Sequence, residues 1–418
     1  MRGQRSSPSR GVALAGGGPL GAIYEIGALV ALSEALDGFD LTDCGVYVGV
    51  SSGAFIAAGL ANGLSAESMH EMFIESDLAD DPFEPDLLLR PAIGEYASRL
   101  ASIPDLLASA ARHYLYGLHG TGPAGFFESF GRLAHALPTG VFDDAGVGKY
   151  LTRLFSEPAR TNDFRQLKRK LFLVATDIDT GESIPFGAPG WDDVPIARAV
   201  QASAALPGLF PPVRIGGRYY VDGALTRTLH ASVALREGVK LLLCVNPLVP
   251  FDARLAAKRA HRKEASVVLG GLPSIMSQTF RTLIHSRLQI GMERYRKDYP
   301  KADVVLFEPN RDDVEMFFTN VFSYSGRRRL CEHAYQRTRE DLRRRRPELR
   351  NVLGRHGIAI DDKVLADKHR TLPTRGRRVV LRRVDDLQRT AGKLGETLDR
   401  LEGLFETCAA TARDRQAG

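Results

Sequence analysis

The chain has few cysteines and no long apolar run, and each shortage excludes a class of protein. Its 418 residues include four cysteines, which stand far apart and form no C-x-x-C pair. This spacing excludes a disulfide framework and a structural zinc site. No apolar run reaches the roughly eighteen residues that a bilayer-spanning helix requires. Because the first apolar stretch carries a glycine motif rather than a secretory signal, we expect a reduced, cytoplasmic protein that is able to act at a membrane surface.

Glycine, in contrast, is abundant, with 41 residues, and it marks three short strings. They are Gly16-Gly17-Gly18-Pro19-Leu20-Gly21, Gly49-Val50-Ser51-Ser52-Gly53 and Asp222-Gly223-Ala224. The second string has the spacing of a nucleophile elbow, in which a serine stands on a tight turn between a strand and a helix. Apolar residues 45–48 before it and 54–60 after it predict that strand and that helix.

Together the three strings predict acyl transfer to water. A serine hydroxyl such as that of Ser51 needs a base within hydrogen-bonding reach to act as a nucleophile. Asp222 offers a carboxylate that is able to take up the serine proton. Free backbone N–H groups in the first string are suited to holding an oxyanion. For Ser51 alone, the alternative is an ordinary N-cap of the following helix.

Two further alternatives remain open from the residues themselves. The string Gly16–Gly21 also fits the G-x-G-x-x-G fingerprint of dinucleotide-binding folds, with Asp37 and Asp40 at loosely suitable distances. Against a nucleotide site, the second strand ends in the elbow and not in an acidic residue. An ordinary hydrolase triad would take a histidine from after its acid, which makes His230 and His285 the candidates. Neither stands in a recognisable motif, which favours a cap or surface role for both.

The order of the motifs resembles the patatin-like phospholipase family: a G-G-G-x-x-G loop, a G-x-S-x-G elbow about thirty residues later and a downstream D-G-A. The segments 175–182 and 197–222 are similar to that family as well, and the resemblance covers about residues 11–230. It implies an α/β three-layer sandwich with a mostly parallel central sheet. It also implies a lipid acyl hydrolase with Ser51 as nucleophile and Asp222 as base, and a substrate in a lipid or membrane surface.

The same resemblance implies an oxyanion hole formed by Gly16, Gly17, Gly18 and Gly21, and no metal or cofactor. The chain departs from the family at one position, because Leu20 stands where the family usually has Arg or Lys. Pro19 also lacks an N–H group and cannot donate to an oxyanion. A rival interpretation is therefore a lipid-binding or scaffolding protein that keeps the fold but has little activity.

The alternation of apolar strands and helical patterns predicts a parallel sheet covered on both faces. Later strands are expected at 171–175, 219–221, 241–245 and 304–307. We expect a flexible tail over 1–10, the acyl hydrolase domain over 11–310, a basic helical extension over 311–370 and an amphipathic helix over 376–412. A helical insertion over about 78–165 is either a lid that touches lipid or a layer packed over the sheet.

The C-terminal part contains an arginine-rich segment, followed by a segment with a heptad repeat of apolar residues. Residues 327–350 hold ten arginines and four acidic residues. A solvated helix with salt bridges to Glu332, Glu340 and Asp341 is the first interpretation, anionic lipid the second, and no nucleic acid is expected. Apolar residues between Val380 and Cys408 recur at steps of four and three, which predicts a helix that packs on a partner surface or forms a homo-oligomer.

Overall fold

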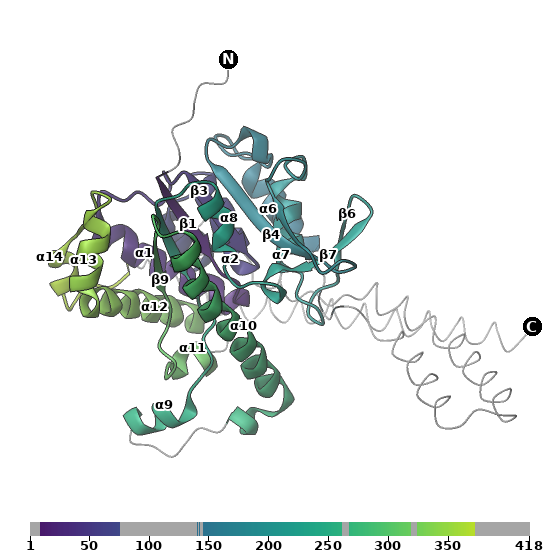
Figure 1. Ribbon diagram of the computed structural model, residues 1–418. Helices are drawn as coiled ribbons and strands as arrows, with labels where there is room; N and C mark the ends of the chain where they lie inside the picture. Colours follow the sequence, from purple (N-terminus) through teal and green to yellow (C-terminus); the bar gives the residue numbers. More distant parts are fainter. Residues whose placement is uncertain are drawn as a thin grey trace, which may run out of the picture. The chain divides into compact units, whose positions relative to one another are not determined.

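The structure, a computed structural model, describes residues 9–75, 140, 142, 145–260, 267–318 and 324–372 (Figure 1). By its internal contacts the chain divides into Met1–Leu372 and Pro373–Gly418, and all described residues belong to the first unit. The predicted heptad helix therefore lies outside the described residues. So does the predicted insertion up to residue 139, while a helix over Ala145–Phe155 falls within its last part.

One mixed sheet forms the centre of this unit, as expected from the apolar runs. Its strands are β1 (Arg10–Leu14), β3 (Val46–Val50), β4 (Lys170–Asp177), β5 (Ser183–Phe186), β6 (Val213–Ile215), β7 (Arg218–Asp222), β8 (Leu241–Val245) and β9 (Asp303–Phe307). Their order is β6-β7-β4-β3-β1-β8-β9, with β5 also paired to β4. The stretch from β4 to β9 is parallel, and β5, β6 and β7 add antiparallel pairs. β1 begins at Arg10, one residue inside the expected tail.

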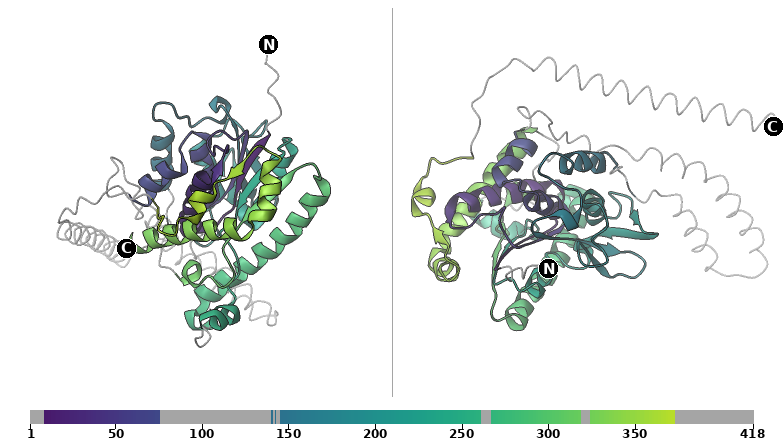
Figure 2. Two further views of the ribbon diagram at one scale, coloured as in Figure 1. Left: turned by 90° about the vertical axis from the view of Figure 1, so that its left-hand side faces the viewer. Right: turned by 90° about the horizontal axis from the view of Figure 1, so that it is seen from above.

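Helices cover both faces of the sheet (Figures 1 and 2). They are α1 (Gly18–Ala35), α2 (Ser52–Ala61), α3 (Ala66–Phe73), α6 (Ala145–Phe155), α7 (Ile196–Ala204), α8 (Ala231–Arg236), α9 (Ala253–Ala260), α10 (Gly271–Asp298), α11 (Val314–Phe318), α12 (Tyr324–Arg344), α13 (Arg346–Gly354) and α14 (Asp362–Ala366). Short 3-10 turns are η3 (Phe164–Gln166), η4 (Gly223–Leu225) and η5 (Val267–Gly270), and a small second sheet pairs β2 (Leu36–Asp37) with β10 (Ala359–Ile360).

Alternate residues of the central strands point into two separate cores. Val12 and Leu14 of β1 join a core with α1, α2, α7 and α12, whereas Ala13 joins the opposite core with α8 and α10. On β3, Tyr47 faces the first core and Val48 faces the second. This alternation is the two-residue period of a strand that is buried on both faces. The predicted three-layer α/β sandwich is thus confirmed.

The arginine-rich helix α12 packs closely on α1, which corrects the expectation of a solvated helix. A Cβ atom on Gly27 of α1 would lie 2.3 Å from the Cys331 carbonyl oxygen, so only glycine allows this approach. Arg339 is 1% exposed and its guanidinium donates to the carbonyl oxygens of Val364 and Asp367, each at 2.6 Å. A buried guanidinium needs such acceptors, because a charge without partners is costly to remove from water.

The outer side of α12 carries salt bridges, as expected for a solvated helix. Arg337 pairs with Glu340 at 2.8 Å, and Arg344 pairs with Asp341 at 2.5 Å. Exposed pairs of this kind contribute about 0–1 kcal/mol each. The basic segment is therefore a structural helix with one buried and one ion-paired face. Among the described helices, none has the length and apolarity that crossing a bilayer would require.

Candidate functional site

Ser51 occupies a strained turn between β3 and α2. Its backbone has φ 54° and ψ −123°, a left-handed conformation that costs a non-glycine residue about 1–3 kcal/mol. Although Ser51 stands at the N-cap position of α2, its side chain makes no capping hydrogen bond. Its hydroxyl is therefore not used as a helix cap, which argues against the alternative that Ser51 is an ordinary N-cap.

The two glycines that flank the elbow are required by close backbone approaches. A Cβ atom on Gly49 would lie 2.5 Å from the Gly53 carbonyl oxygen. A Cβ atom on Gly53 would lie 2.6 Å from the carbonyl oxygens of Leu14 and Ala15, at the end of β1. Side chains do not fit at these distances, so the elbow sequence holds β3, α2 and β1 together at the point where Ser51 stands.

Asp222 lies at the same edge of the sheet as Ser51, on a strand two places along from β3. It ends β7, where it pairs with Ala175 of β4, and its side chain is buried. The Ala224 N–H donates to Asp222 Oδ1 at 2.8 Å. The Ser51 hydroxyl also interacts with this carboxyl group and lowers its pKa. The structure thus brings together two residues that are 171 positions apart in the sequence.

Burial raises the pKa of Asp222 to about 6, although its hydrogen bonds with Ser51 and with the Ala224 N–H oppose this shift. A buried carboxylate loses hydration, and the protonated form is favoured as a result. At pH 7 to 8 the group is still mostly ionised, and its basicity is higher than that of an ordinary aspartate. A carboxylate with these properties is suited to accept a proton from a serine hydroxyl.

The glycine loop lies directly against Ser51. A Cβ atom on Gly16 would lie 2.8 Å from the Ser51 Cβ, and one on Gly17 would lie 2.6 Å from Pro247 Cγ. Gly18 has φ +60° and begins α1. The first N–H groups of a helix have no acceptor within that helix. The backbone N–H groups of Gly17 and Gly18 therefore stand at the positive end of α1, directly after Gly16, which lies against Ser51.

The fourth predicted oxyanion residue differs from the other three. The Gly21 N–H donates to the Gly17 carbonyl at 3.0 Å, so it is engaged within the helix. Its lack of a side chain makes room for Pro247 and for Ser52 Oγ, each 3.0 Å from a Cβ atom built there. Leu20 is half-buried and packs against the core, so no positive charge stands at this position.

The two candidate histidines do not complete a triad. His230 is buried, with φ 46°, and its Nε2 lies 3.2 Å from the Gly223 carbonyl oxygen. Burial lowers the pKa of His230 to about 4, so it is neutral and donates to that carbonyl. His285 is on α10, where its Nε2 lies 3.4 Å from Gln289 Nε2. Within the described part of the chain, neither histidine bonds to Ser51 or Asp222.

Sequence reasoning passed over two buried residues. The Ser51 N–H donates to Ser203 Oγ at 2.8 Å, and the Ser203 hydroxyl donates to the Val174 carbonyl of β4 at 2.6 Å. Glu25 is fully buried on α1, and burial raises the pKa of its carboxyl well above the usual range. The one signal in the sequence was an acidic residue inside the apolar run 22–32.

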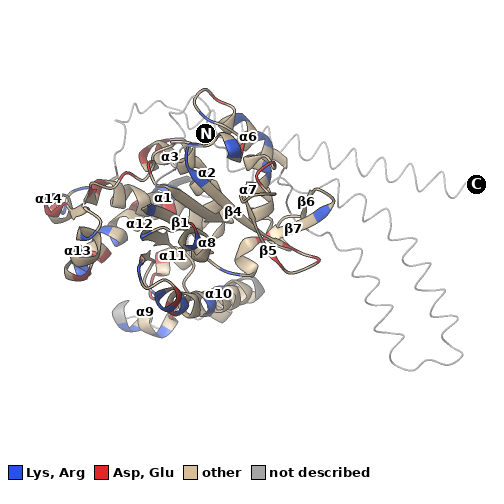
Figure 3. Ribbon diagram, turned by 45° about the horizontal axis from the view of Figure 1, so that its top comes forward, with Lys and Arg blue, Asp and Glu red and all other residues tan. Residues whose placement is uncertain are grey.

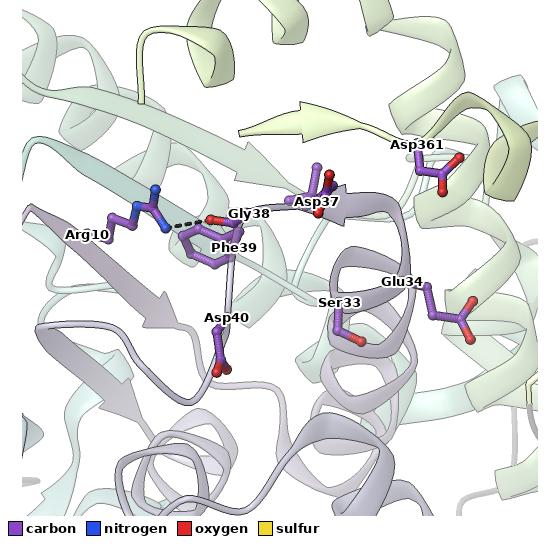
Figure 4. Close-up of a pocket in the computed structure, with 9 residues that line it drawn as sticks. Arg10, Ser33, Glu34, Asp37, Gly38, Phe39, Asp40 and Asp361 are labelled. Atoms are coloured by element: carbon purple, nitrogen blue, oxygen red, sulfur yellow. Dashed lines mark hydrogen bonds between the residues drawn. The ribbon is translucent and has the colours of Figure 1, made fainter. Parts of the chain in front are cut away.

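A pocket of about 470 Å³ lies at the other end of the strands. Figure 4 shows its wall near the start of β1, where Arg10 donates to the Gly38 carbonyl oxygen at 2.6 Å. The carboxylates around it belong to Glu34, Asp37, Asp40 and Asp361. Since Ser51 follows the carboxyl end of β3, which is parallel to β1, this pocket is remote from Ser51. Among the described residues, no group of three or more His, Cys, Asp or Glu side chains is arranged to hold a metal ion.

Comparisons with known proteins bear on the family of this chain. The family model described as "Patatin-like phospholipase" matches residues 12–235. Uncharacterized NTE family proteins of Mycobacterium bovis and Mycobacterium tuberculosis are 27% identical over 199 residues, which are 47% of this chain and 30% of each relative. The match thus spans less than a third of the length of these relatives.

Solved structures give a weaker similarity. VipD from Legionella pneumophila is 16% identical, with a TM-score of 0.37, over 80% of this chain and 66% of that one. The type III effector protein ExoU is 19% identical, with a TM-score of 0.33, over 81% of this chain and 53% of that one.

Proposed function

This chain belongs to the patatin-like phospholipase family, and we propose that it is a lipid acyl hydrolase in which Ser51 and Asp222 carry out the reaction. The observation that carries the proposal is that the Ser51 hydroxyl and the buried Asp222 carboxyl lie close enough for the hydroxyl to lower the pKa of that carboxyl. The strained elbow presents this serine, and the raised pKa of Asp222 gives the base its strength.

The proposed reaction runs through an acyl-enzyme. Ser51 Oγ attacks the carbonyl carbon of a lipid ester while Asp222 takes up the hydroxyl proton. The oxyanion of the tetrahedral intermediate is held by the N–H groups of Gly17 and Gly18. As the bond to the alcohol oxygen breaks, Asp222 returns the proton to that oxygen, and the acyl group stays on Ser51. Water then attacks the acyl-enzyme with Asp222 again as base, which releases the fatty acid and restores the serine hydroxyl.

Leu20 favours a second candidate, a lipid-binding or scaffolding protein with little activity. A half-buried leucine supplies no charge near the oxyanion, and Pro19 supplies no N–H group. The loss of one oxyanion donor lowers a rate by about 10²–10³-fold. A nucleotide-binding enzyme has less support, because Gly16 lies against the Ser51 side chain and not against open space.

Labelling with a fluorophosphonate, combined with hydrolysis of a soluble short-chain ester, tests the proposal. The wild-type chain should be labelled and active, and Ser51→Ala should lose both properties. Ser52→Ala is the matched control, since it removes the adjacent hydroxyl and should leave labelling intact. Asp222→Asn should abolish hydrolysis, and the double variant should be hardly slower than either single one. A folded wild-type chain that is neither labelled nor active would support the lipid-binding candidate instead.

A further inference from the structure

Helix α10 has two apolar faces, and only one of them packs on the sheet. Leu288, Met292 and Tyr295 follow each other at steps of four and three and are buried in the core beneath β1, β3 and β8. On the opposite face stand Met276, Phe280, Leu283 and Ile290, at steps of four, three and seven. These steps place the four side chains along one line of the helix surface. We call these four residues the α10 apolar row.

The α10 apolar row is exposed. Leu283 is 55% and Ile290 is 65% exposed, and Leu269 in the preceding turn is 87% exposed. Eight of the twelve large apolar side chains that the structure describes as exposed lie between Leu255 and Ile290. Single exposed apolar residues are ordinary on a protein surface, but a concentration of this kind marks an interaction surface.

This surface lies beside the turn that follows Asp222. Arg287 stands on the same side of α10 as the apolar row, between Leu283 and Ile290, and it donates to the Leu225 carbonyl oxygen at 2.6 Å. In Figure 1, α9 and the first half of α10 extend beyond the sheet at the edge where β8 ends. The carboxyl ends of β3 and β8 share this edge of the parallel sheet, so Ser51 also lies there.

The charges near the α10 apolar row indicate which kind of partner binds there. No acidic residue occurs between residues 265 and 292. On α9, whose basic positions are blue in Figure 3, Arg254 and Lys258 are exposed. Among the described residues neither makes an ion pair, so both are available to an anionic partner. Basic residues near a membrane surface each favour binding to anionic lipid, and apolar side chains add to it by entering the headgroup boundary.

We propose that the α10 apolar row, with Arg254 and Lys258, docks this chain onto a bilayer that carries anionic headgroups. The proposal rests on the proposed function, since a bilayer is where a lipid acyl hydrolase meets its substrate. Docking at this face brings the bilayer to the edge of the sheet where Ser51 and Asp222 lie.

Flotation of the full chain with vesicles of phosphatidylcholine and phosphatidylglycerol in equal parts tests the docking. The wild-type chain should float with these vesicles and bind less to phosphatidylcholine alone. The double variant Leu283→Ser/Ile290→Ser should bind at least about tenfold more weakly, because burial of each such side chain corresponds to roughly a tenfold change in affinity. Gln289→Ser, an exposed position on α10 outside the row, is the matched control and should bind like wild type.

A separate variant tests the contribution of the two basic residues. Arg254→Gln/Lys258→Gln should weaken binding to the anionic vesicles and reduce its sensitivity to salt. The pair Met276→Gln/Phe280→Ser repeats the test of the row, and a thermal unfolding scan of each variant confirms that it is folded. Folded row variants that bind vesicles like wild type would overturn the proposal.

Two further results separate this proposal from its rivals. If the wild-type chain elutes as a dimer in size-exclusion chromatography and Leu283→Ser/Ile290→Ser elutes as a monomer, a second copy covers the row and the docking proposal is wrong. Short-chain ester hydrolysis should be unchanged in the row variants, because the ester needs no surface. A wild-type chain that binds vesicles but neither labels at Ser51 nor hydrolyses the ester would leave the docking supported and contradict the proposed function alone.

Discussion

Replacing Asp222 with asparagine should stabilise the folded chain at neutral pH while it abolishes hydrolysis. Burial raises the pKa of Asp222 from the ordinary 3.8 to about 6. The folded state therefore holds this proton more tightly than the unfolded state does. Below the unfolded value the protonated group costs nothing. As pH rises through the folded value, the folded chain must carry a buried negative charge, and stability is lost.

The magnitude follows from the shift. Each pKa unit corresponds to about 1.4 kcal/mol, so a shift of about two units costs about 3 kcal/mol once the group is fully ionised. An asparagine has the same shape and no charge, and its side-chain oxygen is able to keep the hydrogen bond from Ala224. The Asp222→Asn chain should be more stable than wild type by about 3 kcal/mol at pH 8 but by only about 1 kcal/mol at pH 4.5.

Urea unfolding at both pH values measures this difference, followed by the fluorescence of Trp191, the single tryptophan. Asp179→Asn is the control, because Asp179 is exposed and its amide variant should change stability little. In the wild-type chain, short-chain ester hydrolysis should rise with pH to a plateau, with a midpoint near 6. An Asp222→Asn chain that is no more stable than wild type at pH 8, or whose gain is equal at both pH values, would refute the reasoning.

Four further predictions concern the elbow, its support, the glycine loop and the C-terminal unit. In urea unfolding, the free energy of unfolding of Ser51→Gly should be about 1 kcal/mol higher than that of Ser51→Ala, because glycine adopts φ 54° without strain. Ser203→Ala should cost about 1–3 kcal/mol in urea unfolding and lower kcat, since it leaves the Ser51 N–H and the Val174 carbonyl unpaired; Ser203→Thr should recover part of both. Leu20→Arg should raise the rate of ester hydrolysis or leave it unchanged, and a large fall would show that the loop differs from that of the family. Truncation after Leu372 removes the second unit but none of the site, so it should keep ester hydrolysis and lose any self-association in size-exclusion chromatography, whereas an insoluble product would mean that this unit supports the fold.

Local patterns in the sequence were sufficient for most strands of the sheet but missed β5 and β6. The runs 171–175, 241–245 and 304–307 are apolar throughout, which is how strands buried on both faces read, and each falls in an observed strand. Residues 219–221 likewise fall within β7. The strand before Ser51 and the helix after it also follow from adjacent residues. These predictions needed no knowledge of which strand pairs with which.

Contacts between segments that are distant in the sequence could not be predicted from local patterns. Ser203 supports Ser51 across 152 positions, and no spacing rule connects the two. Arg339 is buried because carbonyl groups of residues 364–370 surround its guanidinium, while its sequence context is that of a charged surface helix. The α10 apolar row also required the structure, since a helix with apolar residues on two faces gives no clear amphipathic pattern. Only its packing shows which face lies free.

Two residues of the proposed site, Ser51 and Asp222, each destabilise the folded chain. Ser51 holds a backbone conformation that disfavours any side chain, and Asp222 carries a charge in a place that disfavours ionisation. Such features persist only where the surrounding structure fixes them. Here the supports are visible: the approaches at Gly49 and Gly53, and the Ser203 hydroxyl between Ser51 and β4. Because these supports come from β1, β3, β4 and α7, three strands and one helix fix the strained turn at Ser51, and weakening any one support should relax the elbow before it unfolds the chain.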